Sequence, residues 1–396
     1  MTMRLLRLLV PTLFWIVQGS GYALAADVGA IGEDGKPVDW WFIYKVPHLV
    51  GAGGKDDAIG LEYVYFDVKT NKLVESSNKL LDGKGALDLT LNSVLKNAAT
   101  TTGYILYNDE MPDSVITKEN RKDDGSLGHT KGVIAFDTQS KTAFWLLHSW
   151  PKFPDLGPHP QQPALNFGQT FLCLSLDIDT ARQIAVQMAN HQEPQVYEPR
   201  IPTTLPASDP LVRLTQKLNP NASGDSDDLP FKTRAGLDFR VIAKNRKWGK
   251  DFWNGLVGPE LKEDIDVETW IRGKNVIPPI QDTDGVHKTF DIKFVDLTPI
   301  AKYQWPENAD HAKWAVSTGV PPKGQPDNGK NHKWVCVGDI NRMVSQEKRG
   351  GGTIAFQNDA LWSILHKSET TAIVPPPGHN NQQARTHLKV THKPAN

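Results

Sequence analysis

The chain of 396 residues contains only two cysteines, Cys173 and Cys336. It can form at most one intramolecular disulfide, and a chain of this length does not need one in order to fold. Metal sites built on several cysteines are excluded. The sequence also contains no HExxH motif, no paired CxxC motifs and no Walker-type phosphate loop. Because the scattered Asp and Glu residues lack metal-ligand spacing, we expect neither a metal nor a cofactor.

Neither sign of charge dominates the chain. It has 44 Lys and Arg against 45 Asp and Glu, which gives a net charge of −1 with His neutral. No block of basic residues indicates nucleic-acid binding at neutral pH. The 12 His change this in acid, because their protonation at about pH 5 makes the surface cationic. We therefore expect the binding of a polyanion to strengthen in acid.

Long apolar runs are also missing, except for one at the N-terminus that Pro11 interrupts and that is too short to span a bilayer convincingly. Arg4 and Arg7 precede an apolar core at 8–17, and the small residues at 23–25 offer a cleavage site. Residues 1–25 are thus predicted to be a secretory signal, with an uncleaved anchor as the alternative. The mature protein is expected to be secreted or periplasmic, without membrane contact.

Two regions of mixed helix and strand character follow this signal. Apolar runs bounded by Gly and Pro predict strands, and the runs at 132–137 and 142–148 predict a hairpin. Six prolines between 194 and 220 predict a connector. We expect a mixed α+β fold with an N-terminal lobe at 26–192, a connector at 193–230, a C-terminal lobe at 231–365 and a disordered tail at 366–396.

Two His-x-Lys tripeptides carry the strongest chemical signal, one at His129 and Lys131 and the other at His311 and Lys313. In a strand, residues i and i+2 point to the same face, so each tripeptide can direct an imidazole and an ammonium into one pocket. A His that attacks phosphorus or carries a proton, beside a Lys that holds a phosphate oxygen, suits metal-free phosphodiester cleavage. A third tripeptide, at 387–389, is interpreted as accidental because chance supplies about one.

The chain resembles the deoxyribonuclease II family over most of its length outside the connector and the tail. The matching segments are residues 37–47, 128–133, 144–154, 168–173, 310–314, 334–342 and 348–353. The resemblance implies two phospholipase-D-like lobes, each a mixed sheet flanked by helices, that share one active site. It also implies a metal-independent acid endonuclease that leaves 3′-phosphate ends on DNA.

Roles follow from the same resemblance. His129 with Lys131 forms one catalytic half-site, and His311 with Lys313 forms the other. One His attacks phosphorus to give a phosphohistidine, while the other protonates the leaving 5′-oxygen and then activates water. The habit of the superfamily slightly favours His129 as the nucleophile, but the sequence leaves this choice open.

Three further residues are candidates. His148, at the end of the predicted hairpin, matches another functional-looking position of the family, although a hydrogen bond that caps the hairpin would explain it as well. Asp339 and Asn341 are candidates for orienting the second half-site, or are turn residues.

The chain departs from the disulfide pattern of the animal members of this family. Ala315 and Ala355 stand where those relatives have cysteines, and the early cysteine near Ile31 is missing too. Cys173 and Cys336 are left without partners, so we expect two free, buried thiols. These departures, together with the predicted signal, indicate a bacterial exported member.

Two rival functions remain open. One is a phosphodiesterase of the same architecture that acts on RNA or phospholipid. The other is a nucleic-acid-binding relative that has lost turnover, although both His-x-Lys pairs are intact. If two chains pair, a homodimer that clamps duplex DNA would favour double-stranded DNA over lipid.

Overall fold

A computed structural model of the full chain describes residues 27–97, 99–116, 127–156, 165–216, 224–272 and 276–371. The predicted signal, the tripeptide at 387–389 and the tail beyond residue 371 lie outside the described residues. None of the described helices is long and apolar enough to cross a membrane.

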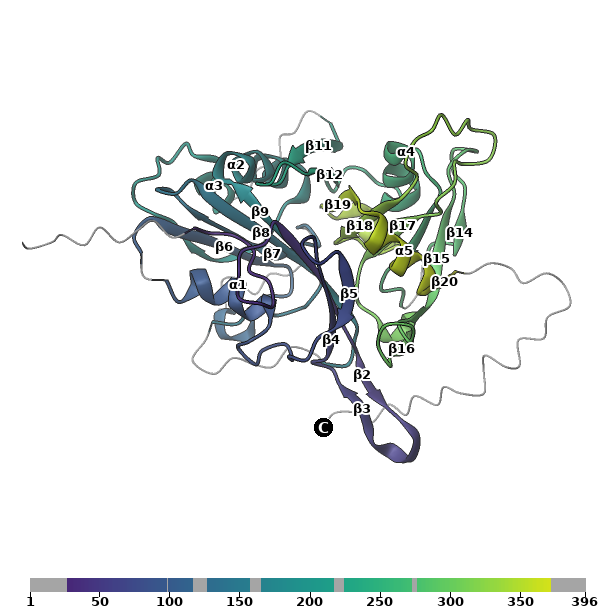
Figure 1. Cartoon of the computed structure of the whole chain (residues 1–396). Coiled ribbons are helices and arrows are strands. Elements are labelled where there is room, and N and C mark those ends of the chain that lie inside the picture. Colours follow the sequence, from purple (N-terminus) through teal and green to yellow (C-terminus); the bar gives the residue numbers. More distant parts are fainter. Residues whose placement is uncertain are drawn as a thin grey trace, which may run out of the picture.

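The N-terminal lobe is built on an eight-stranded antiparallel sheet in the order β10-β6-β7-β8-β9-β1-β4-β5. Helices α1 (Ala86–Leu95) and α2 (Ile178–Gln187) follow β5 and β9 in the chain, and the small hairpin of β2 (His48–Val50) and β3 (Asp56–Ile59) projects away from the lobe (Figure 1). The strands are β1 (Trp40–Lys45), β4 (Tyr63–Asp67), β5 (Lys72–Glu75), β6 (Thr102–Asn108), β7 (Lys131–Asp137), β8 (Thr142–His148), β9 (Gln169–Asp177) and β10 (Val196–Arg200).

Both faces of this sheet are buried, which explains why its strands read as continuous apolar runs. Along β1, Trp40 and Phe42 belong to one hydrophobic cluster, whereas Trp41 and Ile43 belong to another that includes α1. Successive residues of a strand point to opposite faces, so a strand that is buried on both sides has no polar alternation.

The C-terminal lobe holds a ten-stranded sheet in the order β11-β12-β19-β18-β17-β13-β15-β14, with β16 and β20 also paired to β15. The pair β13–β15 is parallel and the other pairs are antiparallel. Its strands are β11 (Ser226–Lys232), β12 (Asp238–Lys244), β13 (Ile265–Glu268), β14 (Ile280–Gln281), β15 (Thr289–Asp296), β16 (Gln304–Pro306), β17 (Trp314–Ser317), β18 (Trp334–Gly338), β19 (Gly351–Gln357) and β20 (Glu369–Thr371). Helices α4 (Gly258–Leu261) and α5 (Asp359–Lys367) belong to this lobe.

The two sheets repeat one pattern of strands. In the N-terminal sheet the strand order β6-β7-β8-β9-β1 is antiparallel throughout, and α2 follows β9. The order β13-β17-β18-β19-β12 in the C-terminal sheet is antiparallel in the same way, and α5 follows β19. Each His-x-Lys tripeptide lies at the start of the second strand of its set: the first ends at Lys131, the first residue of β7, and the second directly precedes β17. The lobes are therefore internal structural repeats, although the sequence shows no repeat beyond the tripeptides.

The lobes lie side by side in Figure 1 and share one core. Trp40 of the N-terminal lobe stacks on Phe66 and also packs edge-on against Phe239 and Phe356 of the C-terminal lobe. This shared apolar core fixes the position of one lobe relative to the other, which a site built from both lobes requires.

The structure confirms the mixed α+β class, the hairpin of β7 and β8, and the free, buried state of both cysteines. The predicted connector contains α3 (Pro210–Leu214), and two strands, β10 and β11, lie at its ends and pair into the two sheets. Proline is tolerated in both because they are edge strands, where one side of the backbone needs no ladder hydrogen bond. Likewise α5 and β20 extend past residue 366 into the predicted tail. The lobe boundaries and the phospholipase-D-like architecture stay predictions.

Candidate active site

The two His-x-Lys pairs meet where the lobes touch, and each is held by the backbone of the opposite lobe. The N–H of His129 donates to Gly350 O at 2.8 Å, and the N–H of His311 donates to Gly168 O at 2.9 Å. Gly350 directly precedes β19 and Gly168 directly precedes β9, so the two contacts are equivalent under the structural repeat. The tripeptides themselves lie just ahead of β7 and β17, and only Lys131 is inside a strand.

The imidazoles are oriented by a second pair of equivalent contacts across the lobe boundary. The Nδ1 of His129 is 2.6 Å from Asp339 O, directly after β18. The Nδ1 of His311 is 3.1 Å from Ser149 O, directly after β8. Since a carbonyl oxygen only accepts hydrogen bonds, we assign the proton of each neutral ring to Nδ1. The Nε2 atoms then carry the lone pairs, ready to attack an electrophile or to take up a proton.

Lys313 lies against its own histidine. Its Nζ is 2.6 Å from His311 O and 3.2 Å from His311 Nδ1. We assign the ammonium hydrogen bond to the carbonyl, because a protonated Nδ1 cannot also accept. Burial lowers the pKa of Lys313 to about 7, and the nearby Lys131 contributes in the same direction. Full protonation of this ammonium therefore requires acid.

A buried carboxylate that the sequence reasoning missed anchors the first half-site. Asp109 forms ion pairs with Lys131 and with Arg349, the latter at 3.0 Å, and its Oδ2 is 3.8 Å from His129 Nε2. Burial alone would raise the pKa of Asp109, but the charges of Lys131 and Arg349, together with the ring of His129, outweigh it and hold that pKa below the usual range. The acidic pair Asp109 and Glu110 directly after the buried strand β6 is the signal that could have found this group.

Both imidazoles are neutral in the free protein at neutral pH. Burial lowers the pKa of His129 and of His311 well below the ordinary value, and neighbouring lysines add to the effect. Only at His129 does a carboxylate, Asp109, act in the opposite direction. A bound phosphodiester would supply the negative charge that makes a protonated imidazole favourable here.

His148 lies deeper, at the end of β8, packed against Phe153 and Phe171. The N–H of Trp150 donates to its Nδ1 at 3.2 Å, which leaves the proton on Nε2. This Nε2 is buried and has no hydrogen-bond partner in the described part of the chain. Burial, and then the charge of Lys131, lower the pKa of His148 to about 3. The ring is thus a neutral donor near the first half-site.

The orienting residues are placed differently from the prediction. Asp339 and Asn341 were expected at the second half-site, but the carbonyl of Asp339 holds His129 of the first. The carboxyl oxygen Oδ2 of Asp339 and the Oδ1 of Asn341 are buried without hydrogen-bond partners among the described residues. Burial raises the pKa of the Asp339 carboxyl far above its usual value. Asp339 belongs to the C-terminal lobe but contacts the histidine of the N-terminal lobe, because each lobe orients the imidazole of the other. The order of residues along the chain does not reveal such contacts between lobes.

One wall of the site beside His311 consists of aromatic and cationic side chains. The ring of Trp270 lies 4.8 Å from that of His311, edge to face, and Phe167 lies 4.5 Å from Trp270. The guanidinium of the exposed Arg272 sits 4.3 Å from the centre of the Trp270 ring. Trp270 is not among the site residues expected from the sequence.

Comparisons with known proteins identify the family of the chain. The family model of deoxyribonuclease II matches residues 30–372. A protein of Burkholderia pseudomallei (strain 1710b) named putative deoxyribonuclease-2 is 56% identical over 364 residues, which cover 92% of this chain and 98% of the relative. The deoxyribonuclease-2-alpha of Rattus norvegicus is 31% identical over 363 residues, or 90% of this chain and 95% of the relative. Plancitoxin-1 of Acanthaster planci is 30% identical over 350 residues, or 86% and 90%.

These matches span both lobes and both His-x-Lys pairs. The chain belongs to the deoxyribonuclease II family of nucleases.

Proposed function

We propose that the protein is an acid endodeoxyribonuclease that hydrolyses phosphodiesters without a metal, through a phosphohistidine, and leaves 3′-phosphate ends. One observation carries the proposal: two buried imidazoles, each with Nδ1 bound to a carbonyl of the opposite lobe and Nε2 unblocked, share a site with two lysines. The names of the relatives, which call them deoxyribonucleases, support DNA as the substrate.

The chemistry runs in two steps. In the first, the Nε2 of one His attacks phosphorus, the bond from phosphorus to O5′ breaks, and the other His gives its proton to O5′. In the second, that now neutral His takes a proton from water, the water oxygen attacks phosphorus, and the nitrogen–phosphorus bond breaks to release a 3′-phosphate. Lys131 and Lys313 stabilise the charge on the non-bridging oxygens, a task that a metal ion performs in other nucleases.

The surroundings of the two imidazoles favour one division of labour. His129 lies 3.8 Å from the carboxylate of Asp109, which stabilises a protonated ring. His311 faces the indole of Trp270 and its own Lys313, and no carboxylate of the described residues forms an ion pair with it. Because the nucleophile must be neutral while the acid is protonated, we assign the nucleophile to His311 and the general acid and base to His129. This reverses the slight preference drawn from the superfamily.

The wall formed by Phe167, Trp270 and Arg272 favours a nucleic acid over a phospholipid. Bases stack on exposed aromatic rings, and an arginine beside such a ring contacts phosphate or base. A phospholipid also has a phosphate that Arg272 could contact, but it has no base to stack on these rings. RNA remains the closest rival substrate, since the reacting groups do not read the sugar. We also propose that the protein is exported to the periplasm or the medium. A homodimer that clamps duplex DNA is a further part of the proposal.

The proposed function is tested by plasmid cleavage at pH 5 in excess EDTA. We expect nicking and then linearisation by the wild type. The products should resist extension by terminal transferase until a phosphatase removes the 3′-phosphate. An RNA duplex and phosphatidylcholine vesicles serve as competing substrates. Cleavage that vanishes in EDTA and returns with Mg²⁺, or ends that extend directly, would refute the mechanism.

The division of labour is tested with thymidine 3′-(p-nitrophenyl phosphate), whose leaving group needs no proton. The first turnover of His129→Ala should still release about one equivalent of nitrophenolate, because only the general acid is missing. His311→Ala should release none, because it lacks the nucleophile. The opposite pattern would exchange the two roles and leave the paired-site chemistry intact.

A further inference from the structure

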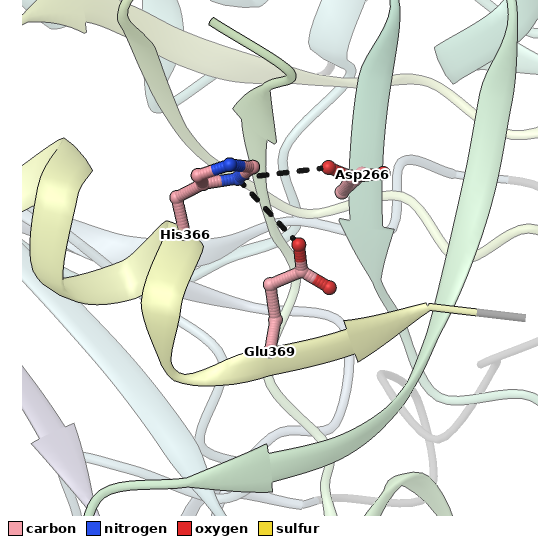
Figure 2. A group of neighbouring side chains, drawn as sticks. All are labelled: Asp266, His366 and Glu369. Carbon is pink, nitrogen blue, oxygen red and sulfur yellow. Dashed lines mark ion pairs between the residues drawn. The ribbon is translucent and has the colours of Figure 1, made fainter. Parts of the chain in front are cut away.

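A second cluster of ionisable side chains lies in the C-terminal lobe, apart from both His-x-Lys pairs. Asp266 of β13, His366 of the last turn of α5 and Glu369 at the start of β20 face one another (Figure 2). The Nδ1 of His366 is 3.8 Å from Asp266 Oδ2 and 3.6 Å from Glu369 Oε1. One nitrogen or oxygen atom of each residue falls within 4.8 Å of the other two, and the described residues contain no other such trio.

The two carboxyls of the cluster are buried, and the side chain of His366 is 32% exposed. The side chains of Asp266 and Glu369 are 6% and 7% exposed, and among the described residues His366 is their only ion-pair partner. Burial raises the pKa of both carboxyls, and the proximity of Asp266 adds to the effect at Glu369. The Nδ1 of His366 and the Oε2 of Glu369 are buried and have no hydrogen-bond partner among the described residues. Since buried polar atoms are almost always satisfied, these atoms call for a ligand.

We propose that Asp266, His366 and Glu369 bind one divalent transition-metal ion of the zinc type. Bonds of about 2.0 to 2.2 Å in a tetrahedron place neighbouring ligand atoms about 3.4 Å apart. The distances of 3.6 and 3.8 Å therefore need only small side-chain adjustments. Imidazole with carboxylates suits zinc. Calcium and magnesium are disfavoured, because they require six or more oxygen ligands or several retained waters.

The role that fits this position is structural. The ion would join three elements, since its ligands come from β13, α5 and β20. The ring of His366 already stacks on Trp362 at 4.7 Å, and Leu361 and Leu365 of the same helix are buried in the core shared by the lobes. Metal binding would therefore fasten the end of the described chain to the C-terminal sheet. Among the described residues, no hydrogen bond or ion pair joins the cluster to a His-x-Lys residue, so we assign the ion no part in the proposed cleavage.

Calorimetric titration of ZnCl₂ into the tag-free full chain at pH 7.5, after EDTA treatment and dialysis, tests the site. Neutral pH limits the competition from protons at the ligands. The wild type should bind one equivalent that Glu369→Gln and His366→Phe lose, the phenyl ring being chosen to keep the stacking on Trp362. At a hundredfold excess of Zn²⁺ over Kd, the Tm of the wild type should rise by about 3 °C, with no rise in the variants. His48→Phe is the matched control, because the exposed His48 faces only one carboxylate, Asp56.

Two outcomes would overturn the proposal. Absence of stoichiometric binding by the wild type would leave the cluster as a pair of carboxyls that share protons. An equivalent retained by both cluster variants would place the ion elsewhere in the chain. Circular dichroism identifies any misfolded variant, and Asp266→Asn then takes its place. None of these readouts uses DNA cleavage, so failure here is independent of failure of the proposed function.

Discussion

The two half-sites have equivalent backbones and different side chains. In both, a carbonyl of the opposite lobe accepts from the backbone N–H of the His, and another accepts from its Nδ1. The neighbouring strand, however, presents Asp109 beside His129 and Trp270 beside His311. Asn108 pairs with Lys131, and Glu268 pairs with Trp314.

Counting along those strands places Asp109 opposite Thr130 and Trp270 opposite Ala312, so the two side chains occupy equivalent positions. In one lobe that position holds a carboxylate, which favours a protonated imidazole, and in the other it holds the indole of Trp270. Under the proposed roles, this difference between two symmetric half-sites favours protonation of the acid, which must be charged, over protonation of the nucleophile, which must be neutral.

The largest effect should come from removing either imidazole. His129→Ala and His311→Ala should each reduce steady-state plasmid cleavage at pH 5 by at least about 10⁴-fold, because each step of the mechanism needs both rings. The double variant should be little worse than either single variant, since the residues act as a unit. Initial rates of nicking measure this. Substantial turnover in either single variant would end the paired-site interpretation.

Removing either lysine ammonium group should reduce the rate of cleavage less than removing an imidazole does. Lys131→Ala and Lys313→Ala should each lower kcat by about 10²- to 10³-fold, the usual loss for one charge partner of a transition state. Because Lys131 also neutralises Asp109, its loss should be the larger of the two. Single-turnover kinetics on a short duplex would show this order. Equal losses would mean that the asymmetry of the half-sites does not extend to the lysines.

Asp109→Asn should shift the pH dependence of kcat/KM toward lower pH. The carboxylate raises the pKa of His129 against the effect of burial, so its removal lowers that pKa further. If His129 must be protonated, the fall in kcat/KM with rising pH should then begin at lower pH, and the rate at pH 5 should drop by about tenfold or more. Glu110→Gln is the matched control, because this half-exposed carboxylate lies 3.8 Å from Lys131 and does not pair with His129. An unchanged profile in Asp109→Asn would contradict the assignment of the acid.

The smallest effect should be a change in the free energy of unfolding caused by Glu268, a buried residue of the C-terminal lobe. Glu268 is fully buried with both carboxyl oxygens unpartnered among the described residues, and burial, followed by the charge of Asp310, raises its pKa well above the ordinary value. A carboxyl with a raised folded-state pKa is most favourable below its unfolded-state pKa and loses stability as pH rises. Glu268→Gln should therefore match the wild type near pH 4.5 and become relatively more stable toward pH 7.5. Urea unfolding at the two pH values measures this, and a constant difference would show that Glu268 is ionised in the folded protein.

The sequence alone was enough to find the candidate reacting groups and to predict much of the local structure. The spacing of His and Lys in two tripeptides, the aromatic and β-branched runs, and the hairpin at 132–148 are local signals, and short-range periodicity is enough to read them. The two cysteines could likewise be expected to remain free.

Only the tertiary structure decided how the half-sites are completed. The contacts of His129 with Asp339 and of His311 with Ser149 join residues 210 and 162 positions apart, and both cross from one lobe to the other. Asp109 and Trp270 acquire their roles because strand pairing places them beside the imidazoles. The trio of Asp266, His366 and Glu369 likewise forms only when α5 and β20 pack against the sheet. Contacts between residues so far apart produce no periodic pattern in the sequence. They depend on which faces of the two sheets pack together, and not on the order of residues along a strand.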